Sequence, residues 1–228
     1  MHRSSISAFA LTRAREMLNP VLPELDPRRT AHVVIDLQNA FVVPGSPSEI
    51  PTCRAIIPNV NRISRVLRSA GGTNVFLRFT VDEHEPAHWA SMRRRVRPEA
   101  LERLSGVFRA GTDTHQLWSG LDIASPDVVL DKTRFSALTP GTCGLQKVLE
   151  QKGVDTVIIT GTQTNCCCEA TARDAMQLGY SVLFVEDGCC THDDATHNNT
   201  LSNLCAFGYA DICPTDAVIH RLPARTAR

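Results

Sequence analysis

Short apolar runs recur along the chain from residue 31 onward, and polar residues follow each of them. The runs are "AHVVIDL" (31–37), "TNVFLRF" (73–79), "DVVLDK" (127–132), "DTVIIT" (155–160) and "SVLFVED" (181–187). Continuous stretches of Val, Ile and Leu are typical of strands that are buried on both faces of a parallel sheet. The pattern therefore predicts five parallel strands.

Helical patterns separate these runs, and several of them end at a glycine. The segments that do so are 59–71, 144–153 and 167–179. Glycine is a common residue just past a helix because the left-handed conformation costs it little. Alternating strands and helices predict an α/β fold, in which a doubly wound, mainly parallel β-sheet is flanked by helices as a three-layer sandwich.

Two stretches fall outside this rhythm. Residues 1–30 are predicted to form an amphipathic helix and a proline-containing extended arm that packs on a neighbouring subunit. Residues 80–126 carry both tryptophans and are predicted to form a helix and loops over the edge of the sheet. Residues 31–228 are then one domain, because a chain of 228 residues that is 43% hydrophobic can bury a substantial core.

Charge and composition narrow the class of protein. Lys plus Arg and Asp plus Glu each number 24, a balance that argues against broad electrostatic binding to nucleic acid or an anionic membrane. The basic run at residues 93–97 is interpreted as a solvated helix face or oligomer contact, with anion binding as the alternative. The apolar run near the N-terminus spans only about five residues, too few for a signal sequence or membrane span. We therefore expect a cytoplasmic protein whose nine cysteines are free thiols.

Two charged residues stand where predicted strands end, which is where open parallel sheets bind ligands. Asp36 follows the first apolar run, and burial beside aliphatic residues would raise its pKa toward that of a useful base. Lys132 ends the third run and is placed to pair with Asp36. The alternatives are that Asp36 caps the following turn and that Lys132 is a surface charge.

Three consecutive cysteines, Cys166 to Cys168, follow the fourth run in "TGTQTNCCCEATARDAM". A thiol in the first turn of a helix is expected to have a lowered pKa, and unpaired amides there can hold an oxyanion. Adjacent helix positions diverge by about 100°, so these thiols cannot converge on one tetrahedral metal ion. Free cysteine is often buried, and packing roles are expected for two of the three and for Cys143, Cys205 and Cys213. Spacing alone does not identify a reactive thiol.

Together these segments resemble the isochorismatase-like cysteine hydrolases. The similarity rests on Asp36 in "VVIDLQNAF", Lys132 in "DKTRFSAL" and the cysteine segment "GTQTNCCCEATARDA", and it covers about residues 29–218. The resemblance implies a catalytic triad in which Asp36 is the acid/base, Lys132 the cationic partner and Cys167 the nucleophile. It implies no cofactor.

The resemblance also implies how the turn before Cys167 is built. A cis peptide bond is expected between Thr162 and Gln163, so that the amides of Gln163 and Cys167 form an oxyanion hole. Hydrolysis of isochorismate, a vinyl ether, does not need a thiol, so the cysteine favours cleavage of an amide. The mechanism expected is attack by Cys167 on a carbonyl, followed by hydrolysis of the acyl-enzyme.

Within the family, "PGTCGL" and the pair Cys167 and Cys168 before Glu169 resemble the branch that acts on ureido and carbamoyl compounds, such as ureidoacrylate and biuret hydrolases. Arg134 is expected to bind a substrate carboxylate, and Trp118 is assigned equally to a pocket wall or to the core. The predicted pocket residues are Phe41, Arg134, Phe135, Gln163 and Trp118.

Several alternatives stay open at this point. Nicotinamidases add a metal site, for which Asp82, His84 and His88 are weak candidates. A streptothricin-type cyclic amide hydrolase and a catalytically idle small-molecule-binding homologue are further alternatives. His197 as the base of a Cys/His pair is disfavoured because Asp36 already serves that role. The resemblance also implies a homo-oligomer, a dimer or tetramer, that acts on a small-molecule substrate.

Overall fold

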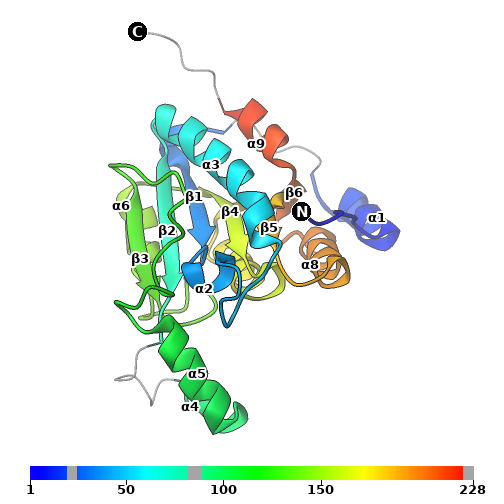
Figure 1. Ribbon diagram of the computed structural model, residues 1–228. Coiled ribbons are helices and arrows are strands. Elements are labelled where there is room, and N and C mark those ends of the chain that lie inside the picture. Colours follow the sequence, from blue (N-terminus) through cyan, green and yellow to red (C-terminus); the bar gives the residue numbers. More distant parts are fainter. Residues whose placement is uncertain (20–24, 82–88, 223–228) are drawn as a thin grey trace.

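The computed structural model describes residues 1–19, 25–81 and 89–222, and Figure 1 shows their arrangement around one β-sheet. The sheet has six strands in the order β3-β2-β1-β4-β5-β6, and all neighbouring strands are parallel. The strands are β1 (Thr30–Ile35), β2 (Thr73–Phe79), β3 (Val128–Lys132), β4 (Thr156–Thr162), β5 (Ser181–Cys190) and β6 (Asp211–Cys213). The predicted α/β fold with a doubly wound parallel sheet is confirmed. Strand β6 was not predicted, because three residues are too few to form an apolar run.

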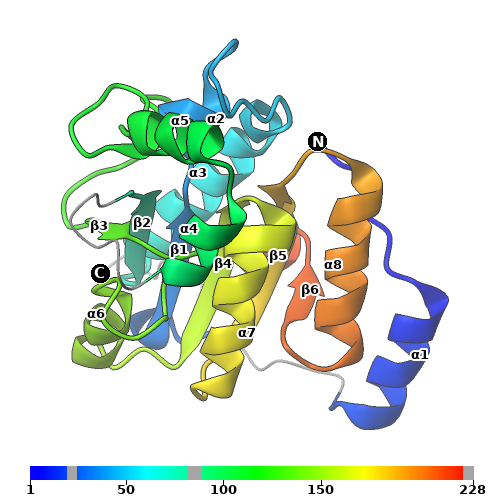
Figure 2. The same cartoon turned by 90° about the horizontal axis from the view of Figure 1, so that it is seen from below.

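Helices cover both faces of the sheet (Figures 1 and 2). Helices α3 and α9 pack on one face, and α6, α7 and α8 pack on the other. Along β1, Val33 and Ile35 belong to the core beneath α6 to α8, whereas Val34 belongs to a core on the opposite side. The covering helices are α3 (Cys53–Ser69), α6 (Leu145–Gln151), α7 (Glu169–Gln177), α8 (Asp194–Ala206) and α9 (Thr215–Arg221).

Helix α3 begins six residues before the predicted segment 59–71, and Pro58 lies inside it. A proline interrupts a helical pattern in sequence because it lacks an N–H and its ring crowds the preceding turn. Here it stands near the N-terminal end of a long helix, whose Ile56, Val60 and Ile63 are fully buried. Burial of this apolar face outweighs the loss of one helical hydrogen bond.

The N-terminal segment packs on its own chain. Helix α1 (Ala8–Met17) is capped at its N-terminus by Ser7, whose side chain accepts a hydrogen bond from the amide of Ala10, and the helix lies beside α8 (Figure 2). The amide of Ser7 in turn donates to the hydroxyl of Ser202 at 3.0 Å. The predicted helix is therefore present, and a contact of this arm with a second subunit stays a prediction.

The segment after residue 88 forms two short helices, where one was predicted. Helices α4 (Ala90–Arg95) and α5 (Pro98–Phe108) lie beyond the carboxyl ends of the strands in Figures 1 and 2. The short helix α2 (Asn39–Val42) follows β1, and a 3-10 turn (Pro27–Arg29) precedes that strand. None of the helices in the described ranges is both long and apolar enough to pass through a membrane.

Candidate active site

The strand order reverses between β1 and β4, since the chain adds β2 and β3 on one side and β5 and β6 on the other. Open parallel sheets bind ligands at the carboxyl ends of the strands at such a switch point. Asp36 directly follows β1, and Thr162 ends β4. Lys132 is the last residue of β3, two strands away from β1. The fold therefore brings together residues that are far apart in the sequence.

Strands β1 and β4 approach closely where they end. Gly161 pairs with Ile35, and its φ of 121° lies in a region that residues with a side chain rarely adopt. A Cβ atom at Gly161 would lie 2.1 Å from the carbonyl oxygen of Ile35. Only glycine fits this position, which sets the start of the turn after β4.

The turn after β4 has an unusual backbone. The peptide bond between Thr162 and Gln163 is cis, and Thr164–Cys168 form a π-helical turn before α7. The carbonyl of Gln163 accepts hydrogen bonds from the amides of Cys166 at 3.1 Å and Cys168 at 3.2 Å. These bonds use the amides on either side of Cys167.

Asp36 and Lys132 form a buried ion pair. The Lys132 Nζ atom lies 2.9 Å from Oδ2 of Asp36, and both side chains are 0% exposed. The same ammonium donates to the carbonyl of Arg134 at 3.1 Å and lies 5.0 Å from the centre of the Phe79 ring. Asp36 itself has a left-handed backbone, with φ 55°, which aspartate tolerates better than most residues.

Burial and pairing move the pKa values of this pair. Burial raises the pKa of the Asp36 carboxyl, although the positive charge of Lys132 opposes the rise. Burial lowers the pKa of Lys132, but its contacts with Asp36 and Cys167 outweigh burial and raise it overall. Lys132 therefore keeps its proton, and Asp36 is a stronger base than an exposed carboxylate.

Cys167 is 7% exposed, and its side chain contacts both Asp36 and Lys132. Its pKa is raised well above the usual value by its contact with the Cys166 thiol, by burial and by the charge of Asp36. The expected lowering of the pKa at a helix N-terminus is therefore wrong for Cys167, because burial and these contacts dominate. A contact with Cys167 instead lowers the pKa of Cys166, which is less buried. A base must take the proton of Cys167, and Asp36 is in contact with it.

The other cysteines differ in burial. Cys168 and Cys213 are buried as expected, whereas Cys143 and Cys205 are only half-buried. Cys166 was expected to be a packing residue, but it lines a pocket as well as packing on the core. All described cysteines are free thiols.

A polar network behind the turn includes the N-terminal segment. The ring of His197 is buried, and its Nδ1 lies 2.9 Å from the Thr164 hydroxyl in the π-helical turn. His2 stacks on His197 with ring centres 4.5 Å apart, and its Nδ1 lies 2.7 Å from a carboxylate oxygen of Asp194. The amide of Thr191 donates to Nε2 of His2 at 3.1 Å. Burial lowers the pKa of His197 to about 4, so this ring is neutral near pH 7.

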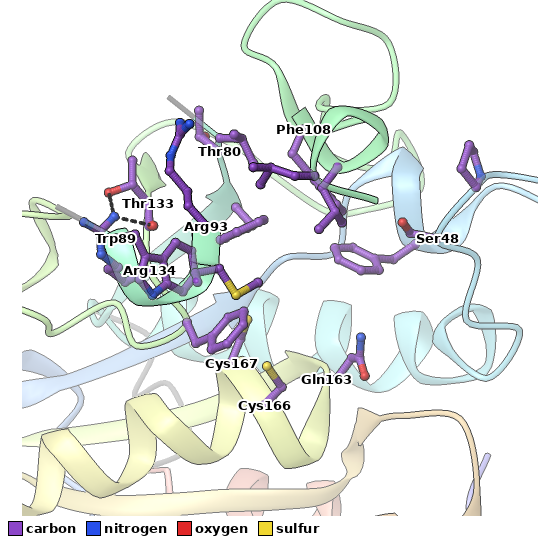
Figure 3. Close-up of a pocket in the computed structure, with 18 of the residues that line it drawn as sticks. Ser48, Thr80, Trp89, Arg93, Phe108, Thr133, Arg134, Gln163, Cys166 and Cys167 are labelled. Carbon is purple, nitrogen blue, oxygen red and sulfur yellow. Dashed lines mark hydrogen bonds between the residues drawn. The ribbon is translucent and has the colours of Figure 1, made fainter. Parts of the chain in front are cut away.

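A cavity of about 460 Å³ opens above Cys167 (Figure 3). Figure 3 shows Cys166, Cys167 and Gln163 on one side, and Phe108 and Thr80 on the opposite side. Four of the five predicted pocket residues line it, namely Phe41, Arg134, Phe135 and Gln163. Trp118 does not line this cavity and instead packs against a buried cluster.

Residues 80–126 were predicted to form a helix and loops over the edge of the sheet, but the residues of this segment that line the cavity were not named from the sequence. We call the five apolar side chains among them the apolar roof: Trp89, Met92, Leu101, Leu104 and Phe108. The spacing of Leu101, Leu104 and Phe108 is that of one helix face, which is a signal visible in the sequence. This spacing predicts that one face of the helix is buried, but it does not predict that this face covers the ends of the strands.

The metal candidates Asp82, His84 and His88 lie outside the described residues. Within the described ranges, no group of three or more His, Cys, Asp and Glu side chains is arranged to hold a metal ion. The metal site therefore stays a prediction.

Comparisons with known proteins identify the family of this chain. The family description "Isochorismatase domain" matches residues 30–215. A ureidoacrylate amidohydrolase, RutB, from Caulobacter vibrioides is 30% identical over 210 residues, which cover 82% of this chain and 90% of that protein. Nicotinamidase 3 of Arabidopsis thaliana is 40% identical over 94 residues, which cover 41% of this chain and 46% of that protein.

A solved structure shows the same fold. The cysteine hydrolase from Pseudomonas syringae pv. phaseolicola 1448A superimposes with a TM-score of 0.79 at 24% identity, covering 90% of this chain and 98% of that one. The family match spans most of the chain, including all the described strands and the turn that holds Cys167. The chain therefore belongs to the isochorismatase family of hydrolases.

Proposed function

We propose that the protein is a cysteine amidohydrolase that cleaves a C–N bond of an amide, ureido or carbamoyl compound through a thioester acyl-enzyme. The observation that carries this proposal is the contact of the Cys167 thiol with the fully buried pair of Asp36 and Lys132 at the switch point of the sheet. The similarity to an amidohydrolase and a nicotinamidase supports C–N bond cleavage. We call Asp36, Lys132 and Cys167 the strand-end cluster.

In the first half-reaction, Asp36 removes the thiol proton as the Cys167 sulfur attacks the carbonyl carbon. The S–C bond forms, and the carbonyl oxygen becomes an oxyanion. Asp36 then gives its proton to the departing nitrogen as the C–N bond breaks. The raised pKa of Cys167 fits this order, since the thiol keeps its proton until substrate and base are in place.

In the second half-reaction, water replaces the amine beside Asp36. The carboxylate takes one proton from the water as its oxygen attacks the thioester, and the S–C bond then breaks to release a carboxylic acid. The proton returns to the sulfur, which restores the starting state. Lys132 stays protonated throughout and stabilises the charge on Asp36 whenever that group is ionised.

The oxyanion hole is assigned to the amides of Gln163 and Cys167. The turn supports this assignment, since the amides of Cys166 and Cys168 already donate to the carbonyl of Gln163. Two amide donors aimed at a developing oxyanion are worth about 10²-fold or more each in rate.

Ammonia release from a panel of primary amides, ureas and carbamoyl compounds tests this function. Wild-type protein should release ammonia from at least one compound, and Cys167→Ala should lose at least about 10³-fold of that activity. Cys205→Ala is the matched control, because Cys205 is half-buried and lies outside the cavity. Intact-protein mass spectrometry should show an acyl adduct in wild type and not in Cys167→Ala. Binding without turnover of any compound would instead support the idle binding homologue.

A nicotinamidase is the second candidate, because 94 residues are 40% identical to one. Its metal candidates Asp82, His84 and His88 were named from sequence. Treatment with a chelator separates the two candidates: loss of activity that zinc or iron restores favours the metal-dependent enzyme, and unchanged activity favours hydrolysis without a metal.

A further inference from the structure

The N-terminal segment reaches the back of the turn after β4. Residues 1–7 precede α1 and lie against α8, with the N-terminus at the start of α8 (Figure 2). The amide of Ser5 donates to the Asn198 side chain at 2.9 Å, and Asn198 donates to the carbonyl of Arg3 at 3.1 Å. These bonds hold the segment along α8. The side chain of His2, which is only 2% exposed, is thereby buried beside the end of β5.

Contacts with three residues fix the ring of His2. Its Nδ1 lies 2.7 Å from a carboxylate oxygen of Asp194, and its Nε2 lies 3.1 Å from both the amide nitrogen and the carbonyl oxygen of Thr191. One face stacks on the ring of His197, with the centres 4.5 Å apart and the planes at 20°. Buried polar groups with satisfied partners make a structure rigid. The ring can therefore act as a fixed support.

Two routes lead from this ring to the turn after β4. The first passes through the stacked His197, whose Nδ1 lies 2.9 Å from the hydroxyl of Thr164. The second passes through Thr191, whose hydroxyl donates to the side-chain oxygen of Asn165 at 2.7 Å. Thr164 and Asn165 are the first two residues of the π-helical turn, and Cys167 lies in the same turn. Both routes therefore end on the backbone that carries the proposed nucleophile.

The opposite end of this turn is held from within the domain. The carbonyl of Cys167 accepts from the hydroxyl of Thr171 in α7 at 2.7 Å, and that hydroxyl accepts from the amide of Ala137 at 3.2 Å. The turn is thus anchored by α7 at one end and by the N-terminal segment at the other. Catalytic groups must be held within about 0.5 Å of the productive geometry, and a displacement of about 1 Å can cost about 100-fold in rate. The anchor at the start of the turn is therefore expected to affect turnover.

We propose that His2 is a positioning residue for the reaction: it fixes the first two residues of the turn and thereby places the thiol of Cys167 and the amide of Gln163. This inference rests on the proposed amidohydrolase function. His2 does not line the cavity, so it acts through Thr191 and His197 without touching the substrate. A role in packing alone would be met by any flat ring of similar size, whereas positioning needs the ring nitrogens.

The variant His2→Phe tests this role, because it keeps a flat ring beside His197 and removes both ring nitrogens. The value of kcat should fall at least about tenfold, because the start of the turn is no longer fixed, while KM should stay within about twofold, because the cavity is unchanged. Both values are measured from ammonia release with a compound that the wild type hydrolyses. An unchanged kcat, or a loss that appears only in KM, would overturn the proposal.

Ser7→Ala is the matched control in the same segment. It removes the side-chain cap of α1, which destabilises the helix, but it leaves both routes from His2 intact. The urea midpoint of unfolding should fall in both variants, whereas kcat should fall only in His2→Phe. An equal loss of kcat in Ser7→Ala would show that turnover follows the stability of the segment, and it would overturn a specific role of His2.

A double-mutant cycle tests the route through Thr191. His2→Phe breaks the first link of this route and Asn165→Ala breaks the last, so the two losses in kcat should not multiply. The double variant should be no more than about threefold slower than the slower single variant. Losses that multiply would show that the two residues act independently, and they would overturn the proposed coupling.

Alkylation separates failure of this proposal from failure of the function. Iodoacetamide should modify Cys167 at least about fivefold more slowly in His2→Phe than in wild type, because a displaced thiol loses its contact with the base Asp36. Tandem mass spectrometry of peptides follows Cys167, and the half-buried Cys205 of the same molecules is the internal reference. A slower rate supports positioning even if no amide is hydrolysed, in which case only the amidohydrolase function fails. An unchanged or faster rate at Cys167 overturns the positioning role even where ammonia is released.

Discussion

The strand-end cluster, through Cys167, and the apolar roof meet at one cavity, but they are built from different kinds of structure. Asp36, Lys132 and Cys167 come from β1, β3 and the turn after β4, and each is nearly or fully buried. The roof comes from the single segment 89–108, and most of its side chains are half-buried. The cluster is fixed by long-range packing of the sheet, whereas the roof rests on two short helices. The residues proposed to carry the chemistry and the apolar side chains of the roof therefore belong to parts of the chain that can change separately.

Removal of the cation should have the largest effect. Lys132→Met leaves the buried Asp36 carboxylate without its partner, which should cost about 3–5 kcal/mol of the free energy of unfolding. The value of kcat/KM should fall at least about 10³-fold, since Asp36 then holds a proton. Urea unfolding and ammonia release measure the two effects.

The double variant Asp36→Asn with Lys132→Met separates the loss of stability from the loss of activity. Without a buried charge it should regain most of the lost stability but none of the activity. Activity in the double variant would show that the pair does not carry the chemistry.

Alanine substitutions at two glycines compare the backbones of the two regions. Gly161→Ala places a Cβ against Ile35 at a φ of 121° and should cost more than about 3 kcal/mol of stability. Gly106→Ala, in α5 of the roof, meets no atom within 4 Å and should stabilise by about 0.5–1 kcal/mol. Thermal unfolding monitored by circular dichroism measures both. Similar changes at the two sites would refute the contrast between a tightly packed cluster and a tolerant roof.

Acid should destabilise the protein through His197, whose ring contacts Thr164 in the turn that holds Cys167. The pKa of this buried ring is about 4 in the folded protein and 6.5 when unfolded, so between these values only the unfolded state binds the proton. Stability is therefore complete above pH 6.5 and falls as the pH drops toward 4, by up to about 3 kcal/mol for this group.

His197→Asn should make the dependence of stability on pH less steep between pH 6.5 and 4, because asparagine does not titrate. The free energy of unfolding, measured by urea at several pH values, gives the two slopes. Arg173→Gln, an exchange on the neighbouring helix α7 that leaves no histidine changed, is the control and should retain the wild-type slope. An unchanged slope in His197→Asn would show that His197 does not contribute to acid lability.

Truncation in the roof should have the smallest effect on stability. Leu104→Ala removes a half-buried side chain and should cost about 1 kcal/mol, whereas Leu149→Ala, at a fully buried position of α6, should cost about 2–5 kcal/mol. Chemical denaturation compares the two. A loss at Leu104 as large as that at Leu149 would mean that the roof is part of the folded core.

Most of the fold could be predicted from the sequence because buried parallel strands have an unmistakable composition. Strands β1 to β5 are continuous aliphatic runs, and the rule that ligands bind at strand ends singled out Asp36 and Lys132. Strand β6 is too short for such a signal, and the start of α3 was hidden by Pro58.

The state of the thiols could not be predicted in the same way. The direction of the Cys167 pKa depends on burial and on its contacts with Cys166 and Asp36, which only the folded arrangement provides. Local reasoning from the helix N-terminus gave the opposite sign. Residues 80–126 were expected over the edge of the sheet, but the residues of the roof could not be named for a related reason, since a helical face such as Leu101 and Leu104 does not reveal which surface it covers.

The left-handed backbone of Asp36 affects how its contribution should be measured. Alanine scanning assumes that a substitution removes a side chain and nothing else. At a φ of 55°, alanine would also lose a backbone preference that aspartate and asparagine share. An Asp36→Ala variant would thus change the backbone preference and the carboxylate chemistry together. Asp36→Asn keeps the backbone preference and removes only the carboxylate.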